Sequence, residues 1–128
     1  MENFKETFKE EAYELLNKLE STLLELEANP DDEDQRLSLF RTMHTIKGSA
    51  AMFGFEHTST FAHTLENCLD SVKSGKVPFT ANIADLTLKS RDHILQLLDF
   101  DGDPPGHLKS YSRELEQSFT STIEELLP

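Results

Sequence analysis

The stretch FRTMHTIKGSAAMFGF, residues 40–55, places one histidine in the middle of a segment with helical periodicity. Lys47 follows His44 by three residues and Gly48 follows it by four, so a helix brings both close to the histidine. Residues 49–51 are all small. A glycine inside a helix costs about 1 kcal/mol relative to alanine, so Gly48 calls for a compensating role.

Outward from this stretch, turn and capping residues divide the chain into five segments with helical spacing. The first ends at ANPDDED, the second runs from about Glu33 to Phe53, and the third from about Glu56 to Ser74. Thr80 can cap the fourth, and DFDGDPPGH separates it from the fifth. No segment shows the alternation typical of a strand. The pattern predicts an all-α fold, an antiparallel up-down four-helix bundle with a fifth C-terminal helix.

The predicted domain organisation follows the same breaks. Residues 1–101 are expected to form the bundle, with the helix of interest at about 33–53. Residues 102–128 form a linker and a last helix, which either packs in the same domain or leads to further domains. The first segment's predicted core stripe is Phe4, Phe8, Ala12, Leu15, Leu19, Leu23 and Leu26.

Composition limits the partners and the compartment. The 24 acidic and 12 basic residues give a formal net charge of −12, which repels nucleic acid and anionic lipid, so neither is an expected partner. The single cysteine, Cys68, cannot form an internal disulfide and falls on an apolar helix face, where a thiol behaves as a small hydrophobe. The chain shows no signal peptide and no apolar run of membrane-spanning length. A cytoplasmic protein, or a cytoplasmic piece of one, is expected.

His44 falls outside the core arc of its helix, in surroundings that suit a phosphorylated imidazole. Lys47 can balance the negative oxygens of a phosphoryl group. Gly48 and Ala51 leave room for a partner's active site, and Leu37 and Phe40 lie on the same exposed surface, so these four residues form a candidate docking surface. A solvated histidine, and for Gly48 close packing between helices, are the alternatives.

A carboxylate that accepts a hydrogen bond from one imidazole nitrogen makes the other a better nucleophile. In the third segment His63, Glu66 and Asp70 share a face, while Phe61, Leu65 and Cys68 mark the buried side. Glu66 is therefore the candidate partner of His44. From the spacing alone, a solvated glutamate remains an open alternative.

Two further interpretations of the same residues are a metal site and an adaptor without chemistry of its own. His44, His57, His63 and Glu66 are possible zinc ligands, but His57 and His63 point to different faces and Lys47 would repel a cation, so no metal site is predicted. A non-catalytic helical adaptor explains the amphipathic stripes. It does not explain a lysine and a glycine beside an exposed histidine.

These residues resemble a known family. MHTIKGSAAMFGF, residues 43–55, resembles the motif of histidine phosphotransfer (HPt) domains, His-x-x-Lys-Gly followed by small residues. HTLENCLD, residues 63–70, resembles the third helix of the phosphotransfer domain of CheA-type chemotaxis histidine kinases. The similarity covers most of the chain and weakens through the last two helices. One departure is Ser49, where CheA-type domains commonly have a second glycine.

The resemblance implies a phosphoryl carrier in a two-component, chemotaxis-type phosphorelay. His44 would be phosphorylated, Glu66 would orient it, Lys47 would balance the phosphate charge, and His63 would support the network. A partner kinase domain that binds ATP and Mg²⁺ would load the phosphate, and an aspartate of a response regulator receiver domain would remove it.

The domain itself shows no nucleotide loop and needs no cofactor of its own, so its chemistry is completed by partners and its enzyme class stays open. Because stand-alone phosphotransfer proteins of multistep relays often lack the His-x-x-Glu-Asn pattern, the resemblance favours a piece of a larger histidine kinase.

Overall fold

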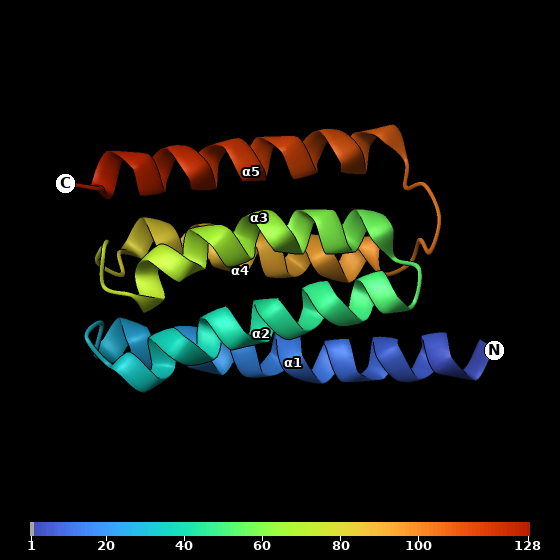
Figure 1. Cartoon of the computed structure of the whole chain (residues 1–128), viewed down its shortest axis with the longest axis horizontal. Helices are drawn as coiled ribbons and strands as arrows, with labels where there is room; N and C mark the ends of the chain where they lie inside the picture. Colours follow the sequence, from blue (N-terminus) through green and yellow to red (C-terminus); the bar gives the residue numbers. More distant parts are fainter. Residues whose placement is uncertain (1) are drawn as a thin grey trace.

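The protein is described here by a computed structural model covering residues 2–128, with side chains from residue 4 onward. The helices are α1 (Glu2–Ala28), α2 (Glu33–Met52), α3 (Glu56–Lys73), α4 (Ala81–Leu97) and α5 (Gly106–Leu126), and residues 2–128 contain no strand. Each helix runs antiparallel to the one before it (Figure 1). The predicted all-α, up-down architecture with a fifth helix is confirmed.

The helix ends follow the capping signals. The side chains of Asp32 and Thr80 each accept a hydrogen bond at 3.2 Å from the backbone N–H three residues later, which satisfies a free donor at the start of α2 and of α4. Gly54 and Gly75 have φ angles of 87° and 77°, in the left-handed region where a side chain is unfavourable. These caps fix where α2 and α3 end, and so which residues of the two helices face each other.

The core lies between α1, α2, α3 and α4, in the order expected for a bundle. α2 packs between α1 and α3, and α1 also packs against α4. On α2 the side that faces the core is buried and includes Leu39, Met43 and Ile46. The α1 stripe is corrected at its first position, because Phe4 is 61% exposed. Phe4 lies in the first turn of α1, at the end that extends past the ends of the neighbouring helices (Figure 1).

α5 packs over α3 and α4, on the side away from α1 and α2 (Figure 1). Its residues Leu108, Leu115, Phe119 and Ile123 are buried in the same apolar cluster as the residues of the other four helices. The last helix therefore closes one side of the bundle and is not a detached extension.

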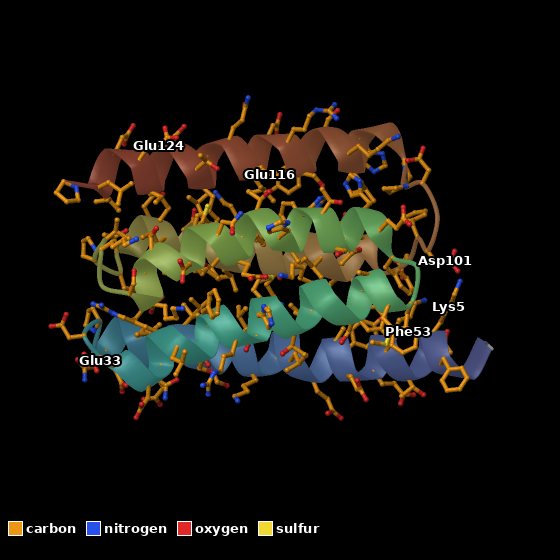
Figure 2. The ribbon with its side chains drawn as sticks, in the orientation of Figure 1. Lys5, Glu33, Phe53, Asp101, Glu116 and Glu124 are labelled. Carbon is orange, nitrogen blue, oxygen red and sulfur yellow. The ribbon has the colours of Figure 1, made fainter. Side chains whose placement is uncertain are left out.

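Most of the acidic side chains are exposed on the outer surface. Glu33, Glu116 and Glu124 are labelled on α2 and α5 in Figure 2, where Lys5 also meets Asp101 at the end of the bundle. Lys5 Nζ lies 2.6 Å from Asp101 Oδ2, an ion pair that joins α1 to the loop after α4. Nowhere in residues 2–128 does a helix combine the length and the apolar character needed to cross a membrane.

Candidate functional site

His44 and Glu66 meet where α2 and α3 pack side by side. The Nδ1 atom of His44 lies 3.2 Å from Oε1 of Glu66. A second link between the helices is made nearby, where the Ser59 hydroxyl donates a hydrogen bond of 2.9 Å to the backbone carbonyl of Lys47. Contacts between α2 and α3 therefore hold the histidine and the glutamate opposite each other.

The bond to Glu66 determines which ring nitrogen of His44 is free. A carboxylate only accepts hydrogen bonds, so Nδ1 must carry the proton. In the neutral ring Nε2 then keeps its lone pair. The His44 side chain is 59% exposed, and Nε2 has no hydrogen-bond partner among the described residues. The geometry presents one nucleophilic nitrogen to solvent.

Lys47 completes the charge arrangement on the same side of α2. Its Nζ lies 2.7 Å from Oε2 of Glu66, in an ion pair that lacks the alignment of a hydrogen bond. Lys47 is 26% exposed and Glu66 only 13%. One carboxylate oxygen of Glu66 therefore faces His44, and the other faces the ammonium group of Lys47.

These neighbours keep Glu66 ionised. Burial alone would raise the pKa of the Glu66 carboxyl, but the combined attraction of Lys47 and His44 outweighs burial, and the pKa lies below its ordinary value. At neutral pH the carboxylate is charged and able to hold the Nδ1 proton.

The surface beside His44 is open on the side of Gly48. Among the described residues no neighbouring group lies within 4 Å of the position that a Cβ on Gly48 would occupy. Close packing between helices is therefore the wrong explanation for this glycine. Gly48 and Ala51 are exposed and Leu37 and Phe40 are half-buried, so these four residues remain available for contact.

Phe40 bounds the site on the opposite side of His44. The two rings stack with centroids 6.1 Å apart and an angle of 16° between their planes. Lys73 Nζ lies 4.0 Å from the centroid of the Phe40 ring, and it is also ion-paired with Asp70 at 2.8 Å. Contacts from α3 thus steady the ring on which the imidazole rests.

His63 is not joined to this network. The residue lies on α3 one turn before Glu66 and is exposed, and its side chain makes no hydrogen bond or ion pair within the described part of the chain. Among the described residues, therefore, no contact links His63 to His44, Glu66 or Lys47.

A second polar cluster, which sequence reasoning missed, lies between α3, α4 and α5. The Ser112 hydroxyl is 3.0 Å from Nε2 of His57 and 2.7 Å from Nε2 of His93. His93 is buried, edge-on to the rings of Phe61 and Tyr111. Burial lowers the pKa of His93 to about 4 and also lowers the pKa of His57. These histidines are structural, and no motif in the sequence marks them.

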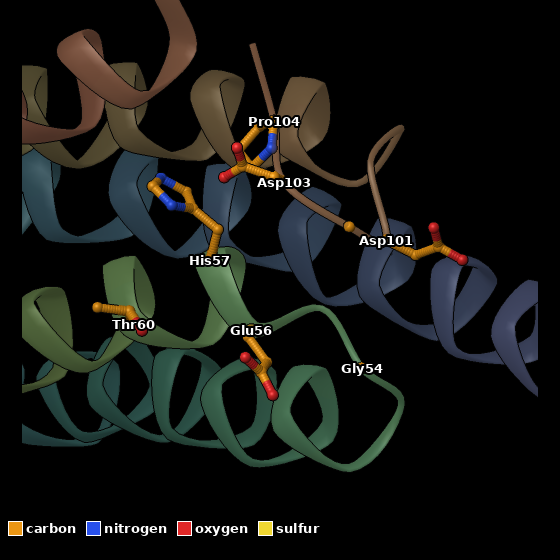
Figure 3. A pocket seen from close by; sticks show the side chains of 8 residues that line it. Gly54, Glu56, His57, Thr60, Asp101, Asp103 and Pro104 are labelled. Carbon is orange, nitrogen blue, oxygen red and sulfur yellow. The ribbon is translucent and has the colours of Figure 1, made fainter. Parts of the chain in front are cut away.

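His57 also lines an open pocket of about 570 Å³ at one end of the bundle. Figure 3 shows its ring near Asp103 and Pro104 of the α4–α5 loop, with Glu56 and Thr60 on α3. The zinc alternative required His57 to join His44, but the two residues have different partners. In the chain from residue 4 onward, no group of three or more His, Cys, Asp or Glu side chains is arranged to hold a metal.

Cys68 lies on the buried side of α3, as the sequence indicated. Burial raises the pKa of its thiol to about 11, so the reactive thiolate is scarce at neutral pH. The cysteine therefore contributes to packing.

A protein family and several known proteins resemble this chain. The family model of the Hpt domain matches residues 3–100, which include α1 to α4. The chemotaxis protein CheA of Halobacterium salinarum is 33% identical over 124 residues, an alignment that covers 91% of this chain and 19% of the relative. The chain thus spans less than a fifth of the length of this curated relative.

Two solved structures share the fold along nearly the whole chain. The solution structure of the histidine phosphotransfer domain of CheA has a TM-score of 0.76 at 32% identity, covering 100% of this chain and 94% of that one. The phosphorylated P1 domain of CheA3 from R. sphaeroides, in complex with CheY6, has a TM-score of 0.80 at 23% identity, covering 98% of this chain and 99% of that one. The likeness extends through α5, which lies beyond the family model.

Proposed function

This chain belongs to the Hpt domain family, and from that premise we propose that it carries a phosphoryl group on Nε2 of His44 in a chemotaxis-type phosphorelay. The donor is ATP held with Mg²⁺ by a partner kinase domain, and the acceptor is an aspartate of a response regulator. The observation that carries this proposal is the bond from Nδ1 of His44 to Glu66, since it leaves Nε2 free on an exposed ring.

The loading step uses the chain's own residues as follows. The Nε2 lone pair attacks the γ-phosphorus of ATP, a nitrogen–phosphorus bond forms, and the bond from phosphorus to the bridging oxygen of ADP breaks. Attack by a neutral imidazole makes the ring cationic, and the Glu66 carboxylate beside Nδ1 stabilises that charge. Lys47, next to Glu66, supplies a positive charge for the transferred phosphoryl oxygens.

Transfer onward reverses this chemistry. The receiver's aspartate attacks phosphorus in line with the nitrogen–phosphorus bond, which breaks and returns its electron pair to Nε2. A receiver active site must approach closely for this, and the open surface at Gly48 and Ala51 gives it space. The phosphorylated P1 domain of CheA3, whose structure contains CheY6, has the same fold.

The lengths of its relatives support a setting for the domain. The curated CheA proteins that it matches are several times longer than this chain, and we place it as the phosphotransfer part of such a histidine kinase, acting in the cytoplasm. Nucleic acid and membrane lipid have no part in this function, in keeping with the net charge of −12.

The decisive experiment is phosphorylation by a CheA-type kinase domain with γ-labelled ATP. We expect one acid-labile, base-stable phosphate, absent in His44→Gln, and its loss when a receiver domain is added. The matched control is His63→Gln, an exposed histidine on the next helix, which should still accept phosphate. Acid-stable label, or label retained by His44→Gln, would contradict the assignment, and a helical adaptor would show no label at all.

A further inference from the structure

A groove between α1 and α4 lies on the face of the bundle opposite to the phosphotransfer site. The site is formed by α2 and α3, whereas α1 and α4 pack together on the other side (Figure 1). The groove has a volume of about 510 Å³ and is lined only by residues of these two helices. No part of the mechanism above uses it.

The floor of the groove is apolar. Leu23 and Ala84 are buried at its base, while Leu24 is 63% exposed and Leu88 is 39% exposed. The side chains that line a groove between two packed helices can accept a third helix in the same way that bundle helices accept each other. Covering the two exposed leucines would remove apolar area from water, which favours association.

The rim of the groove is acidic at both ends. Glu20 and Glu27 stand seven residues apart on α1, and Asp85 and Asp92 stand seven residues apart on α4, so each helix places one carboxylate at each end. Because α1 and α4 are antiparallel, Glu20 and Asp92 lie at one end of the groove, and Glu27 and Asp85 lie at the other end. Four carboxylates thus surround the leucines.

Each end of the groove has two carboxylates and one cation beside them. Arg91 bridges the first end, with its guanidinium 3.3 Å from Glu20 and 2.8 Å from Asp92. At the other end Asp85 is paired with Lys89 at 2.9 Å, and Glu27 has no ion-pair partner among the described side chains. With Lys89 beside the lining, the rim carries four carboxylates and two cations, so its net charge is negative. A ligand with positive charges beside an apolar stripe complements it.

We propose that the α1–α4 groove is a second docking surface, which binds a basic amphipathic helix of a protein partner. The partner's apolar stripe covers Leu24 and Leu88, and its lysine or arginine side chains pair with the carboxylates of the rim, most strongly at Glu27, whose carboxylate has no ion-pair partner among the described residues. A second copy of this chain is a poor occupant, because its net charge of −12 repels the same rim. The partner leaves His44 uncovered, since the groove lies on the opposite face.

The test uses a synthetic peptide with a leucine stripe flanked by lysines, titrated into the isotope-labelled protein and followed by NMR and calorimetry. We expect shift changes concentrated at residues 20–27 of α1 and 81–92 of α4. Leu24→Gln combined with Leu88→Gln should weaken binding at least about fivefold, and Glu27→Gln with Asp85→Asn should weaken it and reduce its salt dependence. Leu127→Gln, at a leucine that is 40% exposed outside the groove, is the matched control and should bind as the wild type does.

Two control peptides separate this docking from general attraction to an acidic protein. A scrambled peptide of the same composition lacks the apolar stripe, and a second peptide replaces the lysines with glutamate, so both should bind at least about fivefold more weakly. Equal affinity for the scrambled peptide, or shift changes spread over the whole surface, would overturn the proposal. Self-association detected by sedimentation and abolished by the Leu24→Gln and Leu88→Gln pair would also overturn it, by making a second copy the occupant.

Discussion

Nδ1 of His44 lies 3.2 Å from Oε1 of Glu66, although 22 residues separate the two in the chain. The antiparallel pairing of α2 and α3 brings them together, and Lys47 sits on the second oxygen of the same carboxylate. One half-buried carboxylate therefore links the nucleophile and the cation. The consequences of this arrangement can be measured residue by residue.

Replacing Glu66 should slow loading of His44 without preventing it. A hydrogen bond to a charged group contributes about 1.5–3 kcal/mol, so Glu66→Ala should lower the rate of phosphorylation by roughly ten- to a hundredfold. Glu66→Gln keeps a hydrogen-bond acceptor without the charge, so its rate of phosphorylation should lie between those of Glu66→Ala and the wild type. The rates are measured with kinase domain in excess. A wild-type rate in Glu66→Ala would remove Glu66 from the mechanism.

Lys47→Met should slow phosphorylation while changing the stability little, because an ion pair with partial exposure contributes at most about 1 kcal/mol. It should also raise the pKa of Glu66, since the ammonium is one of the groups that hold this pKa down. NMR titration of the carboxyl carbon measures the pKa. Lys47→Arg keeps the charge and should lose less activity. Loss of the folded state in Lys47→Met would show that the residue is structural.

Gly48→Ala should raise the free energy of unfolding and lower the rate of phosphoryl transfer. The added methyl group meets no neighbour within 4 Å, so the gain in helix propensity of about 1 kcal/mol is not opposed. The midpoint temperature of thermal unfolding should rise by about 3–5 °C. Gly48→Leu should reduce phosphoryl transfer further than Gly48→Ala, because the larger side chain enters the space where a partner docks. Equal transfer rates in all three proteins would contradict a docking role for this position.

Acidification should destabilise the fold through His93. Its pKa is about 4 in the folded protein and about 6.5 when unfolded, so between these values the unfolded chain binds more protons. The free energy of unfolding should be level above about pH 6.5 and should fall as the pH drops below it, by about 3 kcal/mol at most once the pH reaches 4. His57, which shares Ser112 with His93, acts in the same direction.

Urea unfolding between pH 5 and 7 measures this effect, a range above that in which Glu66 titrates. His93→Gln keeps a hydrogen-bonding group but cannot titrate, so its stability should depend less on pH than that of the wild type. The same slope in both proteins would show that other groups carry the dependence.

Much of the fold and of the site could be predicted from the sequence, because the signals are local. Apolar spacing, the cap at Thr80 and the breaks between segments act within a few residues, so the five helices and the exposed position of His44 followed from them. The burial of Phe4 was predicted wrongly. Spacing identifies a face of a helix but not how far the neighbouring helices extend to cover it.

Contacts between helices depended on the register, which no local pattern specifies. Glu66 and His63 share a face of α3, yet only Glu66 reaches His44, because the angle and offset between α2 and α3 place one turn opposite the ring and not the turn before. His57, His93 and Ser112 come from three helices and meet only after the core has packed. The sequence by itself determined the helices and the chemistry of His44. Tertiary packing decided which side chains surround it, since distances across a bundle are set by the contacts of the whole core.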